Sequence, residues 1–193
     1  MKRKISGILL AGGKSKRMGE DKAFIKYQEK ELFRYPLEIL EHFCDEIIIS
    51  SSNPSFNNTG HLVYPDDVPG LGPIGGIHTC LIKTKNEYSI VLGCDTPLLD
   101  HLTISELIKN IKNNNIVVAV NSTGHPESLV GIYKKKSLAS IDLLIEKKNY
   151  KMSDLLKQEK THYHKLPYSK SKLTQLFSNI NTQEDFQRLS ANE

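Results

Sequence analysis

Short apolar runs that stop at glycines or polar loops recur along the first 120 residues, and longer amphipathic segments separate them. Apolar runs of this length are typical of strands that are buried on both faces of a parallel sheet. The segments between them carry apolar side chains at helical spacing. This alternation predicts an α/β fold with a mostly parallel, doubly wound, Rossmann-like sheet. Strands are expected at 5–10, 47–49, 62–64, 89–92 and 116–120, and helices at 37–43, 74–82 and 102–111.

The pattern changes after Asn121. The remaining segments predict a strand at 128–133, a helix at 138–145, a late strand at 162–166 and a closing helix at 185–189. Neither an internal repeat nor a linker divides the chain, and 193 residues fit one α/β domain. We therefore expect a single domain over residues 1–193.

Composition narrows the class of protein. The three cysteines, Cys44, Cys80 and Cys94, include no C-x-x-C pair, which favours a reducing compartment over a disulfide framework or a zinc site. The apolar stretch after the basic N-terminus is too short for a signal peptide, and no run approaches the roughly 18 residues of a membrane span. We expect a soluble, cytoplasmic protein with no membrane partner.

The net charge of +4 suits nucleic-acid binders and also enzymes that hold several phosphates. Aromatic residues make up only 7% of the chain and tryptophan is missing, so base-stacking platforms are few. Many of the cations that could bind phosphate lie in one loop rather than along a face. This distribution disfavours a nucleic-acid partner.

That loop follows the first strand and combines three glycines with four cations. Glycines let the backbone present N–H groups to an anion, and cations complement a polyphosphate. A flexible turn with a solvated charge run is the other interpretation that composition allows. The loop does not fit a Walker A motif, because the first glycine of that motif would fall at position 8, which is Ile8. It does not fit the dinucleotide fingerprint either, because its first two glycines are adjacent. It reads Leu10-Ala11-Gly12-Gly13-Lys14-Ser15-Lys16-Arg17-Met18-Gly19-Glu20-Asp21-Lys22.

Three more polar loops, at 50–54, 65–72 and 93–97, follow predicted strands and are expected at the same edge of the sheet. In such sheets, ligands bind beyond the carboxyl ends of the strands. Asp95 ends a buried strand, and a hard oxygen ligand there suits Mg²⁺. The residues alone leave a helix N-cap equally open for this aspartate.

The first loop resembles the L-A-G-G-x-S-x-R-M-G-x-D-K signature of the molybdenum cofactor guanylyltransferases, which have a nucleotide-diphospho-sugar-transferase-like fold. Further segments are similar to that family in the same order, and together they cover most of the chain. They are Pro65-Asp66-Asp67, Gly70–Gly76, Cys94-Asp95-Thr96-Pro97, His125-Pro126, Met152–Leu155 and Asn179–Thr182.

The resemblance implies one nucleotidyltransferase domain, with a nucleotide-binding part at 1–121 and a part at 122–193 that binds the pterin acceptor. It implies transfer of GMP from GTP to the terminal phosphate of molybdopterin, with Mg²⁺ as cofactor and release of pyrophosphate. Proteins that mature molybdoenzymes are the further partners that it implies.

The same resemblance assigns roles to individual residues. Arg17, Lys22 and Asp95 are the implied catalytic residues, and Asp95 is the implied metal ligand. The implied nucleotide-binding residues are Leu10, Ala11, Gly12, Gly13, Lys22, Ser50, Asp66 and Asp95. The implied pterin-binding residues are His125, Asn179 and Asn181. A structural hydrogen-bonding role for His125 and capping roles for the two asparagines stay open.

One position departs from the family. Ser50 stands where the family commonly has asparagine, and serine lacks the paired amide donor and acceptor. Asn53 could substitute from the loop, so the identity of the base stays open. The Leu-Ala-Gly-Gly form favours the guanylyl enzymes over cytidylyl relatives, which resemble Leu-Ala-Ala-Gly. The alternative functions are those of a cytidylyl- or sugar-nucleotidyltransferase of the same fold and of a non-catalytic nucleotide-binding partner.

Two further features are interpreted as structural. His162 and His164 lie on one face of a predicted strand, but no third metal ligand is evident, which favours a surface pair. Cys94 is expected to be a small buried side chain rather than a nucleophile.

Overall fold

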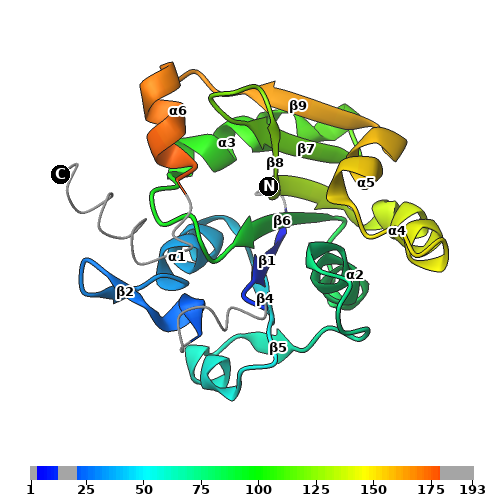
Figure 1. Cartoon of the computed structure of the whole chain (residues 1–193), viewed down its shortest axis with the longest axis horizontal. Coiled ribbons are helices and arrows are strands. Elements are labelled where there is room, and N and C mark those ends of the chain that lie inside the picture. Colours follow the sequence, from blue (N-terminus) through cyan, green and yellow to red (C-terminus); the bar gives the residue numbers. More distant parts are fainter. Residues whose placement is uncertain (1–3, 13–20, 179–193) are drawn as a thin grey trace.

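The computed structural model describes residues 4–12 and 21–178 and contains a seven-stranded sheet with helices on both faces (Figure 1). The strand order is β5-β4-β1-β6-β8-β7-β9. The strands are β1 (Ser6–Leu10), β4 (Glu46–Ser50), β5 (Leu62–Tyr64), β6 (Tyr88–Gly93), β7 (Ile116–Val120), β8 (Pro126–Lys134) and β9 (Thr161–Lys165).

Within the described chain, β8 is the one strand of this sheet that runs against the others. A short turn at 121–125 joins it to β7, and such a connection permits only antiparallel pairing. The Asn121 side chain holds this turn by accepting hydrogen bonds from the backbone N–H groups of Thr123 and His125. The predicted mostly parallel sheet is confirmed.

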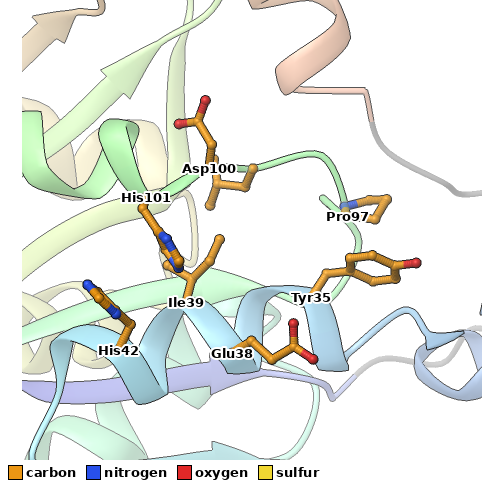
Figure 2. Close-up of a pocket in the computed structure, with 8 residues that line it drawn as sticks. Tyr35, Glu38, Ile39, His42, Pro97, Asp100 and His101 are labelled. Carbon is orange, nitrogen blue, oxygen red and sulfur yellow. The ribbon is translucent and has the colours of Figure 1, made fainter.

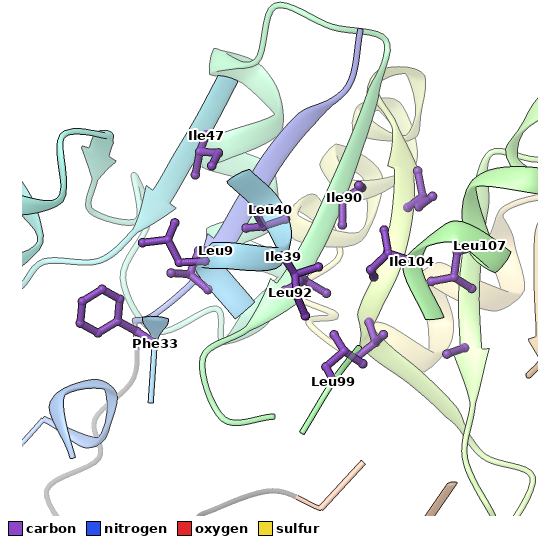
Figure 3. Packing of buried hydrophobic residues seen from close by; sticks show 14 of the residues in the cluster. Leu9, Phe33, Ile39, Leu40, Ile47, Ile90, Leu92, Leu99, Ile104 and Leu107 are labelled. Carbon is purple, nitrogen blue, oxygen red and sulfur yellow. The ribbon is translucent and has the colours of Figure 1, made fainter. Parts of the chain in front are cut away.

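The helices form two layers. The helices α1 (Arg34–Phe43), α3 (His101–Lys109) and α6 (Lys170–Leu176) pack on one face, while α2 (Pro73–Lys83), α4 (Leu138–Glu146) and α5 (Met152–Gln158) pack on the other. Successive residues of one strand point to opposite layers, so Leu9 packs in the first core and Ile8 in the second. Figure 3 shows the first core, where Leu9 and Leu92 of the sheet lie against Leu40 of α1. This burial on two faces is why the strands read as continuous apolar runs.

The predicted elements that fall on described residues agree with the structure to within a few residues, and β5 and β7 agree at both ends. The pattern did not reveal α5, α6, or the small hairpin of β2 (Lys26–Tyr27) and β3 (Lys30–Glu31). Gln28 and Glu29 form the hairpin turn at positive φ without a glycine, so the usual sequence signal is missing. The predicted closing helix at 185–189 lies outside the described residues.

Short 3₁₀ helices complete the fold: η2 (Lys22–Phe24), η3 (Pro54–Thr59), η4 (Ile111–Asn113) and η5 (Lys135–Ser137). Among the helices that the structure describes, none has both the length and the apolar character needed to cross a bilayer.

Candidate active site

A cavity of about 660 Å³ opens at the carboxyl edge of the sheet, where β1, β4 and β6 end. The chain leaves several parallel strands at this edge, so loops that are distant in sequence meet there. The lining residues are Leu10, Gly12, Lys22, Ser50, Ser51, Ser52, Pro65, Asp66, Pro69, Gly70, Gly72, Pro73, Gly76, Gly93, Cys94, Asp95 and Leu129.

Lys22 and Asp95 form an ion pair in this cavity, with 3.1 Å between Nζ and Oδ2. Lys22 is only 8% exposed, so its charge acts in a poorly hydrated environment where electrostatic interactions are strong. Asp95 follows β6, and the loop that carries it is tied to β1 because the Cys94 N–H donates to the Leu10 carbonyl at 3.2 Å. The pair therefore joins the loop after β1 to the loop after β6.

Asp95 does not cap a helix. The N-cap of α3 is Asp100, whose carboxylate accepts from the backbone N–H of Thr103 at 2.9 Å. The capping interpretation of Asp95 is therefore wrong, because the chain runs five residues further before α3 begins. The Asp95 carboxylate remains on the cavity wall, beside a buried cation.

The donor set at Asp95 fits a magnesium ion that is shared with a substrate. Mg²⁺ usually binds through one or two carboxylates plus phosphates and water, so a single aspartate on a cavity wall is sufficient. No group of three or more metal-ligating side chains occurs among residues 4–12 and 21–178, which speaks against an all-protein cage there.

Ser50 and Asp66 form a second polar pair on the cavity wall. The Ser50 hydroxyl donates to Oδ1 of Asp66 at 2.7 Å. Ser50 ends β4 and is 2% exposed, whereas Asp66 is half-buried in the segment after β5. The serine therefore contacts an acidic side chain of the site and is itself almost inaccessible.

Asn53 does not take the place of the expected asparagine. Its Nδ2 donates to Oδ2 of Asp21 at 2.7 Å, and its Oδ1 accepts from the Ser55 N–H at 3.0 Å. The other oxygen of Asp21 accepts from the Ala23 N–H at 3.1 Å and caps η2. Asn53 thus holds the start of η2, where Lys22 lies, and it is not among the residues that line the cavity.

The structure brings together six of the residues implied for the nucleotide site. Ala11 is buried behind the cavity wall, and its N–H donates to the Ser50 carbonyl at 3.0 Å. The cavity residues that sequence reasoning missed include Leu129 of β8, whose position depends on the pairing of β8 with β6. Gly13, Arg17, Asn179 and Asn181 lie outside the described residues. The six residues on the cavity wall are Leu10, Gly12, Lys22, Ser50, Asp66 and Asp95.

His125 lies in the β7–β8 turn, exposed and outside the cavity lining. Its Nδ1 is 2.9 Å from the Thr123 hydroxyl. The turn stands at the carboxyl end of β7, on the same edge of the sheet as the cavity, because β7 runs in the direction of β6. The structure leaves the role of His125 as a prediction.

The other candidate side chains are structural in character. Burial raises the pKa of the Cys94 thiol to about 12, so a nucleophilic thiolate is not favoured there. His162 and His164 are half-buried beside α3, with 3.4 Å between Nε2 of the first and Nδ1 of the second. Burial and the neighbouring His162 lower the pKa of His164, which disfavours a charged imidazole.

A second cavity of about 390 Å³ lies between α1 and the loop before α3 (Figure 2). Its polar groups already have protein partners: Glu38 pairs with Lys30, and the Tyr35 hydroxyl donates to the Tyr27 carbonyl. The rings of His42 and His101 stack with 4.6 Å between centroids. None of the predicted site residues lines this cavity, so it is not the candidate active site.

Comparison with known proteins identifies the family to which the chain is similar. A model of the MobA-like NTP transferase domain matches residues 7–164. A Halalkalibacterium halodurans protein is 33% identical over 189 residues, with 93% of this chain and 94% of the relative covered. A Bacillus subtilis protein is 34% identical over 186 residues, with 93% and 91% covered. Both are described as probable molybdenum cofactor guanylyltransferases.

A solved structure shows the same fold. Molybdopterin-guanine dinucleotide biosynthesis protein A from Archaeoglobus fulgidus superposes with a TM-score of 0.77. The match covers 97% of both chains at 20% sequence identity. At this identity the likeness shows the fold alone, which is that of a nucleotidyltransferase with a nucleotide-diphospho-sugar-transferase-like sheet.

Proposed function

Because the chain belongs to the MobA-like NTP transferase family, we propose that it transfers GMP from GTP to the terminal phosphate of molybdopterin. The products are molybdopterin guanine dinucleotide and pyrophosphate. Relatives that match nine-tenths of the chain are described as probable molybdenum cofactor guanylyltransferases. The observation that carries the proposal in this chain is the Lys22–Asp95 pair, set in a cavity at the end of the glycine-containing loop.

The reaction is a displacement at phosphorus. An oxygen of the molybdopterin phosphate forms a bond to the α-phosphorus of GTP, and the bond from that phosphorus to the bridging oxygen of the β-phosphate breaks. A phosphate monoester is largely ionised at neutral pH, since its second pKa is about 6, so no strong general base is required. Catalysis then rests on positioning and on neutralising the charge of the triphosphate.

The described residues can supply both contributions. The buried ammonium of Lys22 would contact the triphosphate, where low hydration strengthens its attraction for developing negative charge. Gly12 has no side chain on the cavity wall, which lets a nucleotide approach the end of β1 closely. Arg17 is proposed to contact the same triphosphate. Ser50 and Asp66 belong to the nucleoside end of the cavity.

Asp95 is proposed to hold Mg²⁺, with substrate phosphates and water as the remaining ligands. When bound, the ion neutralises phosphate charge and polarises the α-phosphate. The loop after β6 keeps the Asp95 carboxylate at the cavity wall, where it pairs with the Lys22 ammonium at 3.1 Å.

The acceptor is proposed to bind through the part at 122–193. His125 lies at the same sheet edge as the cavity, and Asn179 and Asn181 are the other expected pterin contacts. The three free cysteines support the expected reducing, cytoplasmic setting. Maturation proteins that receive the product are the proposed protein partners.

The direct test uses purified protein with molybdopterin, molybdate and Mg²⁺, and with either GTP or CTP as the second substrate. We expect a guanine dinucleotide of the pterin, identified by mass, and we expect it to disappear when EDTA removes the metal. A cytosine dinucleotide would overturn the base assignment. No dinucleotide from folded protein would refute the transferase proposal, and undiminished product in EDTA would refute the metal dependence.

A further inference from the structure

Asp66 is held by a neighbour on an adjacent strand. The Ser50 hydroxyl, at the end of β4, donates to its Oδ1 at 2.7 Å. A hydroxyl has one proton to donate, and Ser50 is 2% exposed, so a ligand has little access to the serine itself. The Asp66 carboxylate, by contrast, is half-buried on the cavity wall.

Gly76 leaves the space in which this hydrogen bond forms. A Cβ atom at Gly76 would lie 2.7 Å from the Ser50 Oγ, 3.0 Å from Cδ2 of Leu10 and 3.3 Å from Oδ1 of Asp66. Real Cβ atoms essentially never approach a heavy atom as closely as the first of these distances. Any side chain at Gly76 would therefore have to displace the Ser50 hydroxyl, the carboxylate or both.

The backbone around Asp66 is fixed separately. The Asp67 N–H donates to the Thr79 hydroxyl of α2 at 2.9 Å, and the Ser51 N–H donates to the Tyr64 carbonyl of β5 at 2.9 Å. These bonds set the path of the chain but not the rotamer of the Asp66 side chain. The hydrogen bond from Ser50 therefore sets the direction of the Asp66 carboxylate.

We propose that Ser50 and Gly76 are positioning residues for Asp66, and that Oδ2 of Asp66 accepts a hydrogen bond from the nucleoside of GTP. The Ser50 hydroxyl donates to Oδ1, and among residues 4–12 and 21–178 no side chain or backbone group forms a hydrogen bond or ion pair with Oδ2. Ser50 thus acts on the nucleotide through Asp66 rather than by contact, which explains how serine serves where an asparagine was expected. This inference rests on the proposed function.

The test compares GTP binding and turnover in wild type, Ser50→Ala and Ser50→Thr. A hydrogen bond to a charged group contributes enough that Ser50→Ala should weaken GTP binding by about tenfold. The kcat at saturating GTP should change less than about twofold, because Asp66 contacts the nucleoside and not the reacting phosphorus. Ser50→Thr keeps the hydroxyl and should restore the affinity. Ser55→Ala, an exposed serine five residues away, is the matched control.

Inorganic tripolyphosphate separates positioning from a general effect on the cavity. Its affinity should be the same in wild type and Ser50→Ala, because it has no nucleoside. Equal weakening of GTP and tripolyphosphate would overturn the proposal. So would a Ser50→Ala variant that binds GTP as tightly as wild type.

Gly76→Ala should also weaken GTP binding, and its effect should be smaller in the Ser50→Ala background, where the hydroxyl that it displaces is gone. Fully independent effects would contradict a shared action on Asp66. If Gly76→Ala does not fold, the Ser50 variants still decide the matter. A wild type that neither binds GTP nor forms the guanine dinucleotide would refute the proposed function. A wild type that does both, beside an unaffected Ser50→Ala, would overturn only the positioning role.

Discussion

The Nζ atom of Lys22 lies 3.1 Å from Oδ2 of Asp95, although 73 positions separate the two residues in the sequence. The lysine side chain is 10% exposed and the aspartate side chain is 27% exposed. The pair therefore holds two charges on the wall of a cavity with limited hydration. If the pair acts on GTP as proposed, removing either charge should lower turnover.

Asp95→Asn should lower turnover by roughly 100-fold or more, because the variant loses the charge proposed to hold Mg²⁺. The fold should persist, since asparagine keeps an oxygen that can accept from Lys22. Steady-state rates with GTP and molybdopterin, together with circular dichroism, provide the measurement. Asp142→Asn, an exposed aspartate on α4, is the control. Full activity in Asp95→Asn would exclude the metal-binding role.

Lys22→Ala should reduce kcat by a larger factor than it raises KM for GTP, because charge builds up most strongly as pyrophosphate leaves. A loss of about 100-fold in kcat is expected for removal of one such donor. Lys136→Ala removes an exposed lysine of η5 and serves as the comparison. A raised KM with unchanged kcat would instead assign Lys22 to ground-state binding.

Lys148→Gly should stabilise the protein without changing its activity. Lys148 has φ +52° in the turn after α4, where the Asn149 N–H donates to the Leu144 carbonyl at 2.9 Å. Glycine adopts this left-handed conformation without the strain of a side chain, so a gain of about 0.5–1 kcal/mol is expected. Thermal unfolding should show a Tm higher by roughly 1–4 °C.

The neighbouring Lys147 provides the control for that substitution. It has φ −78° and is exposed, so Lys147→Gly removes a similar side chain without relieving strain. It should lower the Tm slightly, because glycine loses more backbone freedom on folding. Equal shifts in both variants would show that the left-handed conformation of Lys148 costs nothing.

Tyr168→Phe should lower stability in a pH-dependent way. Burial has the largest influence on the pKa of Asp100 and acts to raise it, but hydrogen bonds from Tyr168 and Thr103 bring this pKa below 3.8. A carboxyl whose pKa is lowered by folding stabilises the protein above its ordinary pKa and loses that contribution as pH falls through the folded-state value. Urea unfolding should therefore show a loss of about 1 kcal/mol at pH 6 and a smaller loss at pH 3.

Tyr163→Phe is the matched control for the acid experiment. Its hydroxyl donates to the Leu156 carbonyl at 3.2 Å, an acceptor that does not titrate. The cost of that variant should be the same at both pH values. A Tyr168→Phe variant whose loss is equally independent of pH would refute the link between Tyr168 and the charge of Asp100.

The sequence was sufficient to predict most strands of the sheet. Strands such as β1 and β7 are buried on both faces, so their apolar character is continuous and visible without any knowledge of their neighbours. Parallel strands also end at a common edge, which is why Asp66 and Asp95 could be assigned to one site before their distance was known. The long motif at 10–22 and the order of the later segments indicated the family, and the comparisons confirm it.

Other features depended on contacts between distant residues. The hairpin of β2 and β3 turns through Gln28 and Glu29, which carry no local turn signal, and β8 lies between β6 and β7 although it follows both in sequence. Leu129 reaches the cavity only because of that strand order.

The sequence by itself determined the layered sheet and the edge at which the site forms, because periodicity and strand direction are local properties. Only the tertiary structure decided that Ser50 contacts Asp66 and that Asn53 contacts Asp21. A hydrogen bond forms or fails within a few tenths of an ångström, and that distance is set by strand register and by the packing of α2 at Gly76. No local pattern contains that information.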